Sequence, residues 1–382
     1  MTAQSDTPPA QPMAWILPQP AALPVWGRTP AERTRRELKK LGIADQAATS
    51  TTETTAPGLW LRGDAIFHQS VLKGLVANPG CALVDEQARP LALHLTAGTP
   101  PAAALAWLQE TGPRPPGLRE VRTSDVASLY NVTLRRRDDP YALRVTPEHL
   151  PALEKRLFMS TYKGVTDLVT KYWCPVPARI VTKWCVALKF TPNFVTAISG
   201  VLAVVVCYLF AAGQFGAGLA LGWVMTFLDT VDGKLARVTM TSSKFGDVLD
   251  HGIDLLHPLA WYYTWGMGLV ATGLGADFVT MMLLIFGGYI AGRVCEGIFI
   301  KLHGFHLHVW RRFDSAFRLV LARRNPNMIL LTLAVLLGRP DLGLWLVAWW
   351  TVATLAVHLV QVVQSIAARR GAPLRSWLET AP

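Results

Sequence analysis

The sequence predicts an α-helical integral membrane bundle of six transmembrane helices, preceded by a small α/β cytoplasmic domain. Hydrophobic residues make up 51% and charged residues 16% of the 382-residue chain, which is too apolar for a purely soluble protein and too long for one domain. The apolar residues are also unevenly distributed. Residues 1–160 mix polar, charged and proline-containing stretches, whereas long charge-poor segments dominate from about Thr191 onward.

The N-terminal part, which we expect to be a domain of residues 1–150, alternates short apolar runs with helix-like stretches. The runs are MAWIL, LWLRGDAIF, CALVD and LALHLTA, and the helix-like stretches lie at about 29–42, 67–77 and 101–110. Such alternation is typical of an α/β domain. The first residues are proline-rich and lack the basic start of a signal peptide, so we expect this domain in the cytoplasm.

Residues 151–190 are predicted to be a linker that contains an interfacial amphipathic helix. Lysines, an arginine and tryptophans recur through residues 160–191, which places Trp173 and Trp184 at headgroup depth and the basic side chains toward lipid phosphates. A plain linker is the alternative interpretation. Membrane lipid is therefore a predicted partner of this segment.

The membrane domain is predicted to span residues 191–368, with a cytoplasmic tail at 369–382. Its six apolar segments lie at about 192–213, 215–237, 246–268, 275–300, 315–337 and 342–366. An even number of spans places both ends on one side, and the loops on that side carry the lysines and arginines. The positive-inside rule therefore predicts a multi-pass protein of the cell (inner, cytoplasmic) membrane with N- and C-termini in the cytoplasm. The net charge of +11 is thus explained by a membrane surface, with no nucleic acid as partner.

The most informative pattern is a set of aspartates and small residues inside otherwise apolar helices. Asp229, Asp232, Gly233 and Ala236 lie at i, i+3, i+4 and i+7, so they share one helix face, which Arg237 extends. Gly246, Asp250 and Asp254 follow at successive i+4 steps and line one face of the next helix. A short turn near 241–244 can bring the two faces together. The result would be a cavity with carboxylate walls and a floor of small residues.

Ionisable side chains within membrane helices predict a functional site, because they are costly to keep there. Carboxylate oxygens suit Mg²⁺ or Mn²⁺, and two such ions would neutralise the aspartates and a bound diphosphate together. The small residues would let a bulky ligand approach the backbone, and Arg237 would balance charge on a phosphate. The alternative is that the aspartates pair with arginines and only hold the bundle together.

Four further arginines are candidates for an anion pocket that binds a phosphorylated acceptor. Guanidinium groups match phosphate well, and they are Arg293, Arg318, Arg323 and Arg324. Three of them lie at the start of the fifth apolar segment, where positive-inside anchoring explains them without any ligand. Arg293 can also pair with Glu296, three residues further along the same helix.

The aspartate pattern resembles, position for position, the signature D-x-x-D-G-x-x-A-R-x8-G-x-x-x-D-x-x-x-D of the CDP-alcohol phosphotransferases, also called CDP-alcohol phosphatidyltransferases. All eight fixed positions are present, and Thr191-Pro192-Asn193-Phe194-Val195-Thr196 resembles the family's entry to its first transmembrane helix. The resemblance covers about 160–368.

The resemblance implies transfer from a CDP-linked donor to an acceptor alcohol with release of CMP, at the cytoplasmic side of the membrane. It implies that Asp254 is the general base and that Asp229, Asp232 and Asp250, with Asp254, hold the metals. Gly233, Ala236, Arg237 and Gly246 would contact the CDP part of the donor. Homodimers are common in the family, so the resemblance also implies a second copy as partner.

The N-terminal domain resembles sugar-phosphate nucleotidyltransferases in two segments, Gly27–Arg33 with the basic helix that follows and Leu61–Ala65. It lacks their G-x-G-T-R phosphate loop, so we expect a degenerate domain. Such a fusion resembles enzymes that join inositol phosphate units to CDP-inositol. The expected role is phospholipid or polar inositol or glycerol phosphodiester synthesis, with donor and acceptor undecided. The alternative is a non-catalytic membrane protein that binds nucleotide or metal for docking.

Overall fold

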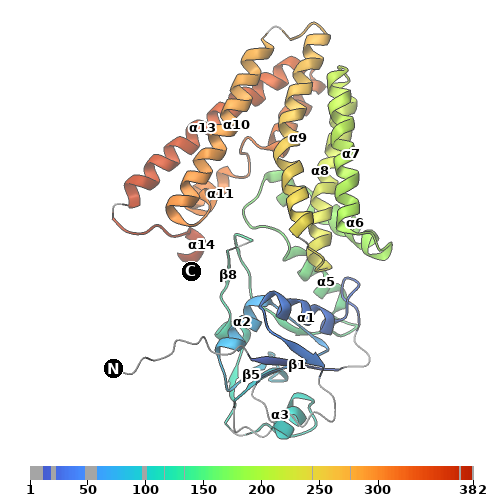
Figure 1. Cartoon of the computed structure of the whole chain (residues 1–382), viewed down its shortest axis with the longest axis vertical. Helices are drawn as coiled ribbons and strands as arrows, with labels where there is room; N and C mark the ends of the chain where they lie inside the picture. Colours follow the sequence, from blue (N-terminus) through green and yellow to red (C-terminus); the bar gives the residue numbers. More distant parts are fainter. Residues whose placement is uncertain are drawn as a thin grey trace. The chain divides into compact units, whose positions relative to one another are not determined.

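The computed structural model describes residues 12–18, 23–47, 58–96, 101–115, 117–132, 134–242, 244–275, 277–369 and 371–380. Within these ranges it does not describe the side chains of 101, 244, 245, 247, 249–251 and 380. The chain divides into two compact units (Figure 1). The first comprises Met1–Asn131 and Arg137–Leu157, and the second comprises Val132–Arg136 and Phe158–Pro382.

The first unit contains a mixed sheet, whose described strands lie in the order β2-β1-β3-β6-β5-β7. These strands are β1 (Met13–Leu17), β2 (Asp45–Ala47), β3 (Gly58–Arg62), β5 (Cys81–Val84), β6 (Pro90–Leu95) and β7 (Arg119–Val121). β1 runs parallel to β2 and β3, β5 runs parallel to β7, and β6 is antiparallel to both β3 and β5. A small antiparallel pair, β4 (Ala65–Phe67) with β10 (Ala142–Arg144), lies beside it.

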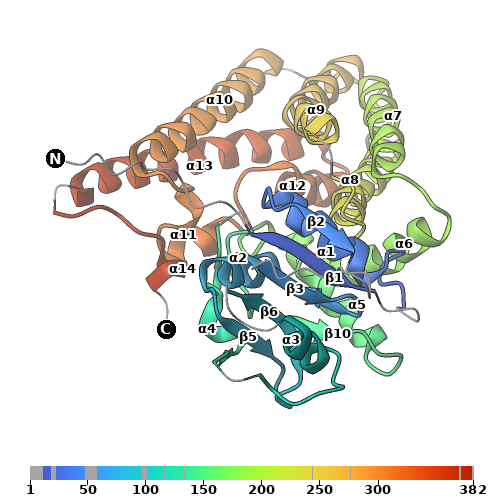
Figure 2. The same cartoon turned by 60° about the horizontal axis from the view of Figure 1, so that its bottom comes forward.

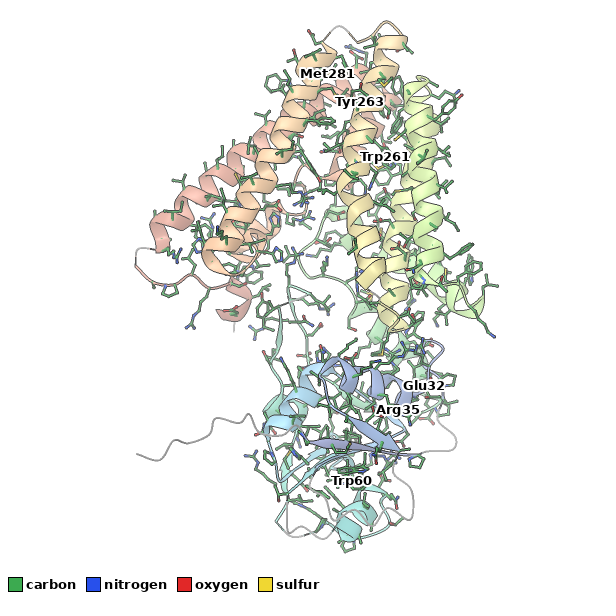
Figure 3. All side chains as sticks on the ribbon, in the orientation of Figure 1. Glu32, Arg35, Trp60, Trp261, Tyr263 and Met281 are labelled. Carbon is green, nitrogen blue, oxygen red and sulfur yellow. The ribbon has the colours of Figure 1, made fainter. Side chains whose placement is uncertain are left out.

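Successive residues of a strand point to opposite sides of the sheet, and both sets of side chains in β1 are buried. Ala14 and Ile16 of β1 pack with residues of α1 (Pro30–Lys40) and α2 (Gln69–Ala77). Trp15 and Leu17 pack instead with residues of α3 (Pro101–Leu108), and the Trp15 ring stacks on that of Trp60. Figures 2 and 3 show these helices around the sheet and Trp60 within it. The predicted α/β architecture, including each predicted apolar run and helix, is confirmed.

Short elements complete the first unit and lead out of it. They are α4 (Thr123–Val126), β8 (Tyr130–Asn131), β9 (Arg136–Arg137) and α5 (Leu150–Met159). The start of α1 shows local sequence control, since Thr29 accepts a hydrogen bond from the Glu32 amide and Glu32 caps the Thr29 amide in return.

The second unit is helical. Its elements are η1 (Val169–Trp173), α6 (Pro175–Ala187), α7 (Pro192–Ala211), α8 (Phe215–Val238), α9 (Lys244–Ala271), α10 (Phe278–His303), η2 (Leu307–Val309), α11 (Arg312–Phe317), α12 (Arg324–Leu336), α13 (Pro340–Arg369) and α14 (Trp377–Thr380). Among the described helices, α7, α10 and α13 are long and apolar enough to cross a membrane.

The helices pack in a connected bundle that brings sequence-distant segments together. α7 packs against α8 and α9, α10 against α13, and α12 against both α13 and α8. Their shared core includes Trp261, Trp265 and Met281, and Figure 3 labels the first and last of these. Trp261 also donates its indole N–H to the Ala203 carbonyl at 3.0 Å, which ties α9 to α7.

The fifth predicted segment, 315–337, is not a continuous helix. α11 ends at Phe317 and α12 begins at Arg324, and its 13 residues reach only about 20 Å, short of the ~30 Å of a bilayer core. The residues between them form turns because their backbone groups have partners elsewhere. The Leu168 amide donates to the Leu319 carbonyl, and the Ala322 amide donates to Thr354 Oγ1. Two arginines of the segment, Arg323 and Arg324, pair with carboxylates of other helices.

Candidate active site

α8 carries the first half of the aspartate pattern on one face, as its spacing predicts. Asp229, Gly233, Ala236 and Arg237 all line one cavity of about 310 Å³ in the second unit. Asp232 is buried, and its Oδ2 accepts a hydrogen bond from Thr196 Oγ1 of α7 at 2.6 Å. The last threonine of the T-P-N-x-x-T segment, Thr196, therefore fixes the side chain of Asp232.

α9 carries the second half of the pattern. Asp254 lines the same cavity, and its side chain is 47% exposed. Gly246 lies near the start of α9 and is not among the described residues that line the cavity. Asp250 lies on the same helix, but its side chain is outside the described part of the structure.

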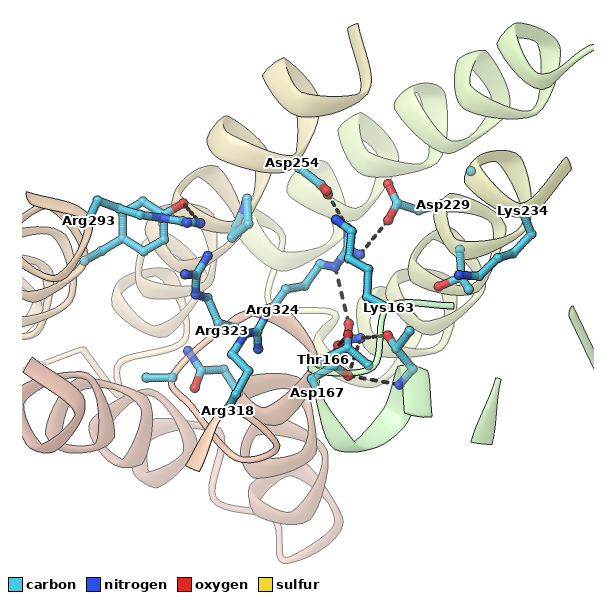
Figure 4. A pocket seen from close by; sticks show the side chains of 18 of the residues that line it. Lys163, Thr166, Asp167, Asp229, Lys234, Asp254, Arg293, Arg318, Arg323 and Arg324 are labelled. Atoms are coloured by element: carbon cyan, nitrogen blue, oxygen red, sulfur yellow. Dashed lines mark hydrogen bonds and ion pairs between the residues drawn. The ribbon is translucent and has the colours of Figure 1, made fainter. Parts of the chain in front are cut away.

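Asp229 and Asp254 converge on one cation, the guanidinium of Arg324 (Figure 4). Arg324 donates to Asp229 at 2.6 Å and to Asp254 at 2.9 Å, and its Nη1 lies 3.2 Å from His257 Nε2. Two carboxylates from different helices thus face one small volume. No group of three possible metal ligands is found among the described side chains, which do not include Asp250.

The other wall of the cavity is strongly basic. Lys163, Arg293, Arg318 and Arg323 line it together with Arg324. The partly buried Glu296 of α10 neutralises part of this charge, since it accepts from Arg323 at 2.5 Å and lies 3.5 Å from Arg293. The expected Arg293–Glu296 pair is therefore present, with Arg323 as a second partner.

Arg318 differs from the other arginines of this wall. Its Nη1 is buried and has no hydrogen-bond partner within the described part of the chain. A buried guanidinium donor without a partner is costly, and a bound anion would satisfy it.

Asp167 connects the segment before η1 to the start of α12. It accepts hydrogen bonds from the Thr170 amide at 3.0 Å and from the Asn325 side-chain amide at 2.9 Å. Burial alone would raise the pKa of Asp167, but these hydrogen bonds and the charge of Arg318 lower it below its ordinary value. An ionised Asp167 thus anchors the residue next to Arg324.

In the first unit, Asp64 follows β3 where nucleotidyltransferases carry an aspartate, but here it is neutralised by arginines. Both of its carboxylate oxygens accept from Arg62 at 2.9 Å, and Arg144 lies 3.4 Å away. Burial would raise the pKa of Asp64, yet the hydrogen bonds and charge of Arg62, with that of Arg144, lower it. The carboxylate is therefore occupied by internal ion pairs.

The fold and site define an apolar helical protein with a polar cavity of aspartates facing arginines, consistent with a membrane-bound transferase acting on anionic substrates. A family model for CDP-alcohol phosphatidyltransferases matches residues 189–303. The archaetidylinositol phosphate synthase of Pyrococcus horikoshii is 30% identical over 173 residues, which cover 45% of this chain and 83% of that protein. The chain belongs to the CDP-alcohol phosphatidyltransferase family, and it is a transferase of the membrane.

Two further comparisons are more distant. The bifunctional IPC transferase and DIPP synthase of Aquifex aeolicus is 24% identical over 224 residues, covering 56% of this chain and about half, 47%, of that protein. Crystal structures of the Mycobacterium tuberculosis phosphatidylinositol phosphate synthase also match. The form with CDP-DAG bound has a TM-score of 0.39 at 19% identity, covering 48% of this chain and 92% of that one. The form in complex with manganese and citrate has a TM-score of 0.38 at 18% identity, covering 48% and 88%.

Proposed function

We propose that this chain transfers a phosphoalcohol or phosphatidyl group from a CDP-linked donor to an acceptor alcohol. In the reaction the acceptor hydroxyl oxygen bonds to the donor's second phosphorus, the one that carries the alcohol. The bond between that phosphorus and the bridging oxygen breaks, and CMP leaves with the bonding electron pair. The hydroxyl proton passes to a base, so the products are a phosphodiester and CMP.

The convergence of Asp229 and Asp254 on one cation carries this proposal. Carboxylates from neighbouring helices that already share a positive partner are the donor set that a hard divalent cation prefers. The residues present therefore fit the metal, and we assign Asp229, Asp232, Asp250 and Asp254 to hold Mg²⁺ or Mn²⁺, as two ions. Bound there, the ions would neutralise the donor's diphosphate.

Asp254 is the proposed general base. Its carboxylate lies on the cavity wall and is about half exposed, so an acceptor hydroxyl can reach it from the open side. Arg324 Nη1 donates to its Oδ1 at 2.9 Å and so holds the carboxylate at this wall.

The CDP part of the donor is assigned to Gly233, Ala236, Arg237 and Gly246. At Gly233 a Cβ atom would lie 3.1 Å from Arg237 Nη2, so glycine leaves room beside the guanidinium. A phosphate there could approach the helix backbone and the arginine together.

The acceptor is proposed to be a phosphorylated alcohol of the inositol phosphate class. The basic wall of Arg293, Arg318, Arg323 and Arg324 supports it, because Arg318 Nη1 lacks a partner in the described structure. The names of the two curated relatives point to the same class of product.

The second unit is proposed to cross the cell membrane six times, with the short α12 as part of the fifth crossing, both termini in the cytoplasm and a homodimer as the working form. α6 supports the interfacial role of residues 151–190. Exposed apolar side chains of α6 and of the residues on either side of it recur at helical spacing as a stripe suited to lipid. They are Trp173, Val176, Ile180, Trp184 and Leu188.

The N-terminal domain, 1–150, is proposed to be a degenerate nucleotidyltransferase without a metal site at Asp64. The bidentate ion pair with Arg62 and the ion pair with Arg144 support this, because two arginines already neutralise this one carboxylate, whereas one arginine is shared by two carboxylates in the second unit.

Asp254→Asn tests the proposal directly. Purified protein in detergent, with Mg²⁺, is supplied with CDP-diacylglycerol or CDP-inositol as donor and with inositol phosphate or glycerol phosphate as acceptor. The wild type should release CMP with one donor and acceptor pair, and the variant should be slower by about 10²–10⁴-fold, the range for loss of a general base.

Full turnover by Asp254→Asn with every active pair would contradict the base assignment. If no donor released CMP while CDP or Mg²⁺ still bound, the non-catalytic docking protein would be the better account.

A further inference from the structure

Residues Val132–Arg136 belong to the second unit, although their neighbours on both sides in the sequence belong to the first. The described residues of this short segment lie against the connecting segment, Phe158–Gly164, which precedes the first helices of the membrane part. No residue of Val132–Arg136 lines the cavity among those described. The hydrogen bonds of this segment to the connecting segment are a route by which it can affect the reaction.

The contact between the two segments consists of hydrogen bonds from one side chain and one backbone amide to backbone carbonyls. Arg136 Nη1 donates to the Met159 carbonyl at 2.8 Å and to the Tyr162 carbonyl at 3.2 Å. The Gly164 amide donates to the Leu134 carbonyl at 2.9 Å. These bonds fix the connecting segment at three successive points.

Gly164 allows this approach because it has no side chain. A Cβ atom there would lie 2.5 Å from Arg136 Cβ and 2.6 Å from the Arg135 carbonyl oxygen. Both distances are shorter than carbon atoms tolerate, so any larger residue must push the segments apart.

The connecting segment also accepts hydrogen bonds from two basic residues of α8, the helix that carries Asp229 and Asp232. The buried Thr161 carbonyl accepts from Arg237 Nη1 at 2.9 Å and from Lys234 Nζ at 3.3 Å. Lys234 Nζ also lies 3.5 Å from the centre of the Tyr162 ring. With Nη1 held by Thr161, Nη2 of Arg237 is the end that lies beside Gly233 on the cavity wall.

We propose that Val132–Arg136 is a positioning element for donor binding, which acts through the connecting segment on Arg237. The inference rests on the proposed function, in which Arg237 contacts the donor's diphosphate. Arg136 and Gly164 keep the Thr161 carbonyl in place, and that carbonyl orients the guanidinium. Displacement of a charged group by about 1 Å is enough to weaken binding and catalysis at such a site.

The test compares Arg136→Ala and Gly164→Ala with wild type in the full-length chain. Calorimetry measures the affinity for CDP in the presence of Mg²⁺, and steady-state kinetics measure KM for donor and acceptor. We expect CDP affinity to fall and donor KM to rise about tenfold, the size of one charge-assisted hydrogen bond, with acceptor KM unchanged. Arg136→Lys can reach one of the two carbonyls and should recover part of the loss.

Two control variants separate positioning from general damage. Arg137→Ala removes the same side chain one residue further on, in the first unit, and Gly287→Ala adds a methyl group where nothing lies within 4 Å. Both should bind CDP like wild type. Size-exclusion profiles and melting temperatures identify variants that fail to fold. If Arg136→Ala or Gly164→Ala fails to fold, the CDP affinity and donor KM of Arg136→Lys test the proposal instead.

CDP affinity and donor KM within twofold of wild type for folded Arg136→Ala and Gly164→Ala would overturn the inference. So would an equal change in donor and acceptor KM, which a merely structural role predicts. If the wild type released no CMP from any donor, the proposed function would fail. The CDP affinities would still decide the positioning role.

Discussion

At the residue scale, Arg324 is central to the charge balance of the site. Two carboxylates that face each other in a largely apolar bundle repel, and the guanidinium between Asp229 and Asp254 removes that repulsion. In this arrangement the arginine stands where a divalent cation would neutralise the same two oxygens. The pairing of aspartate with arginine and the proposed metal site would therefore be alternative states of one set of residues.

Arg324→Met should make the stability of the protein depend on a divalent cation. The methionine keeps length but removes the charge, so in EDTA the variant should lose roughly 3 kcal/mol, the low end for breaking a buried ion pair, because Asp254 is half exposed. Mg²⁺ should restore most of this loss by binding the folded state. Thermal unfolding in detergent, with EDTA or with Mg²⁺, measures both effects.

The stability of Arg324→Met relative to wild type, measured with EDTA and with Mg²⁺, tests this prediction. A stability loss that is the same with EDTA and with Mg²⁺ would mean that the cation does not replace the arginine.

Residue spacing alone predicted that Asp229 and Asp254 would meet, because i+3 and i+4 steps place each on a defined helix face. It did not predict that Thr196 holds Asp232 or that Arg324 bridges the aspartates. These partners are 36 and 95 residues away in sequence, and no local pattern encodes such pairs. An excess of arginines just before Asn325-Pro326 was the available signal for Arg324.

At the element scale, the C-terminal segment stabilises the turn region that carries Arg318. Ser376 Oγ donates to the Val309 carbonyl at 2.7 Å, and the Trp377 indole donates to Ser315 Oγ at 2.9 Å. Ser315 Oγ in turn donates to the His308 carbonyl at 2.7 Å. The tail thus secures η2 and α11, which directly precede Arg318, Arg323 and Arg324, the arginines proposed to bind the acceptor.

Trp377→Phe should therefore weaken acceptor binding without affecting the donor. The substitution keeps the ring but removes a hydrogen bond of about 1 kcal/mol, which predicts roughly a fivefold rise in KM for a phosphorylated acceptor. Initial rates at varied acceptor and saturating donor measure it. A rise in donor KM of the same size would show that the tail supports the whole bundle and not this turn region.

Helices and strands with a strong periodicity of apolar residues could be predicted from the sequence. Features that depend on contacts between residues far apart in the sequence could not. The apolar runs of β1, β3, β5 and β6 and the long helices follow from local pattern. The mixed sheet order depends on pairing between strands far apart in sequence. The break between α11 and α12 depends on Thr354 and Leu168, whose bonds to the turn lie outside any local window.

At the scale of the whole molecule, an α/β unit and a helical membrane unit are joined in one chain. The chemistry of the family resides in the helical unit, where the aspartates and the arginines share one cavity. The first unit has a well-packed sheet with helices on both faces, yet its Asp64 is occupied by Arg62. A stable core has therefore been kept where we propose that a catalytic site has been lost.

The central claim is that one phosphodiester is made for each CMP released. The most direct measurement follows CMP by chromatography and the phosphodiester by ³¹P NMR, with purified protein, Mg²⁺, a CDP-linked donor and a phosphorylated acceptor alcohol. The account predicts equal amounts of both products, formed only when the acceptor is present. CMP released at the same rate without acceptor, or no CMP from any donor, would contradict it.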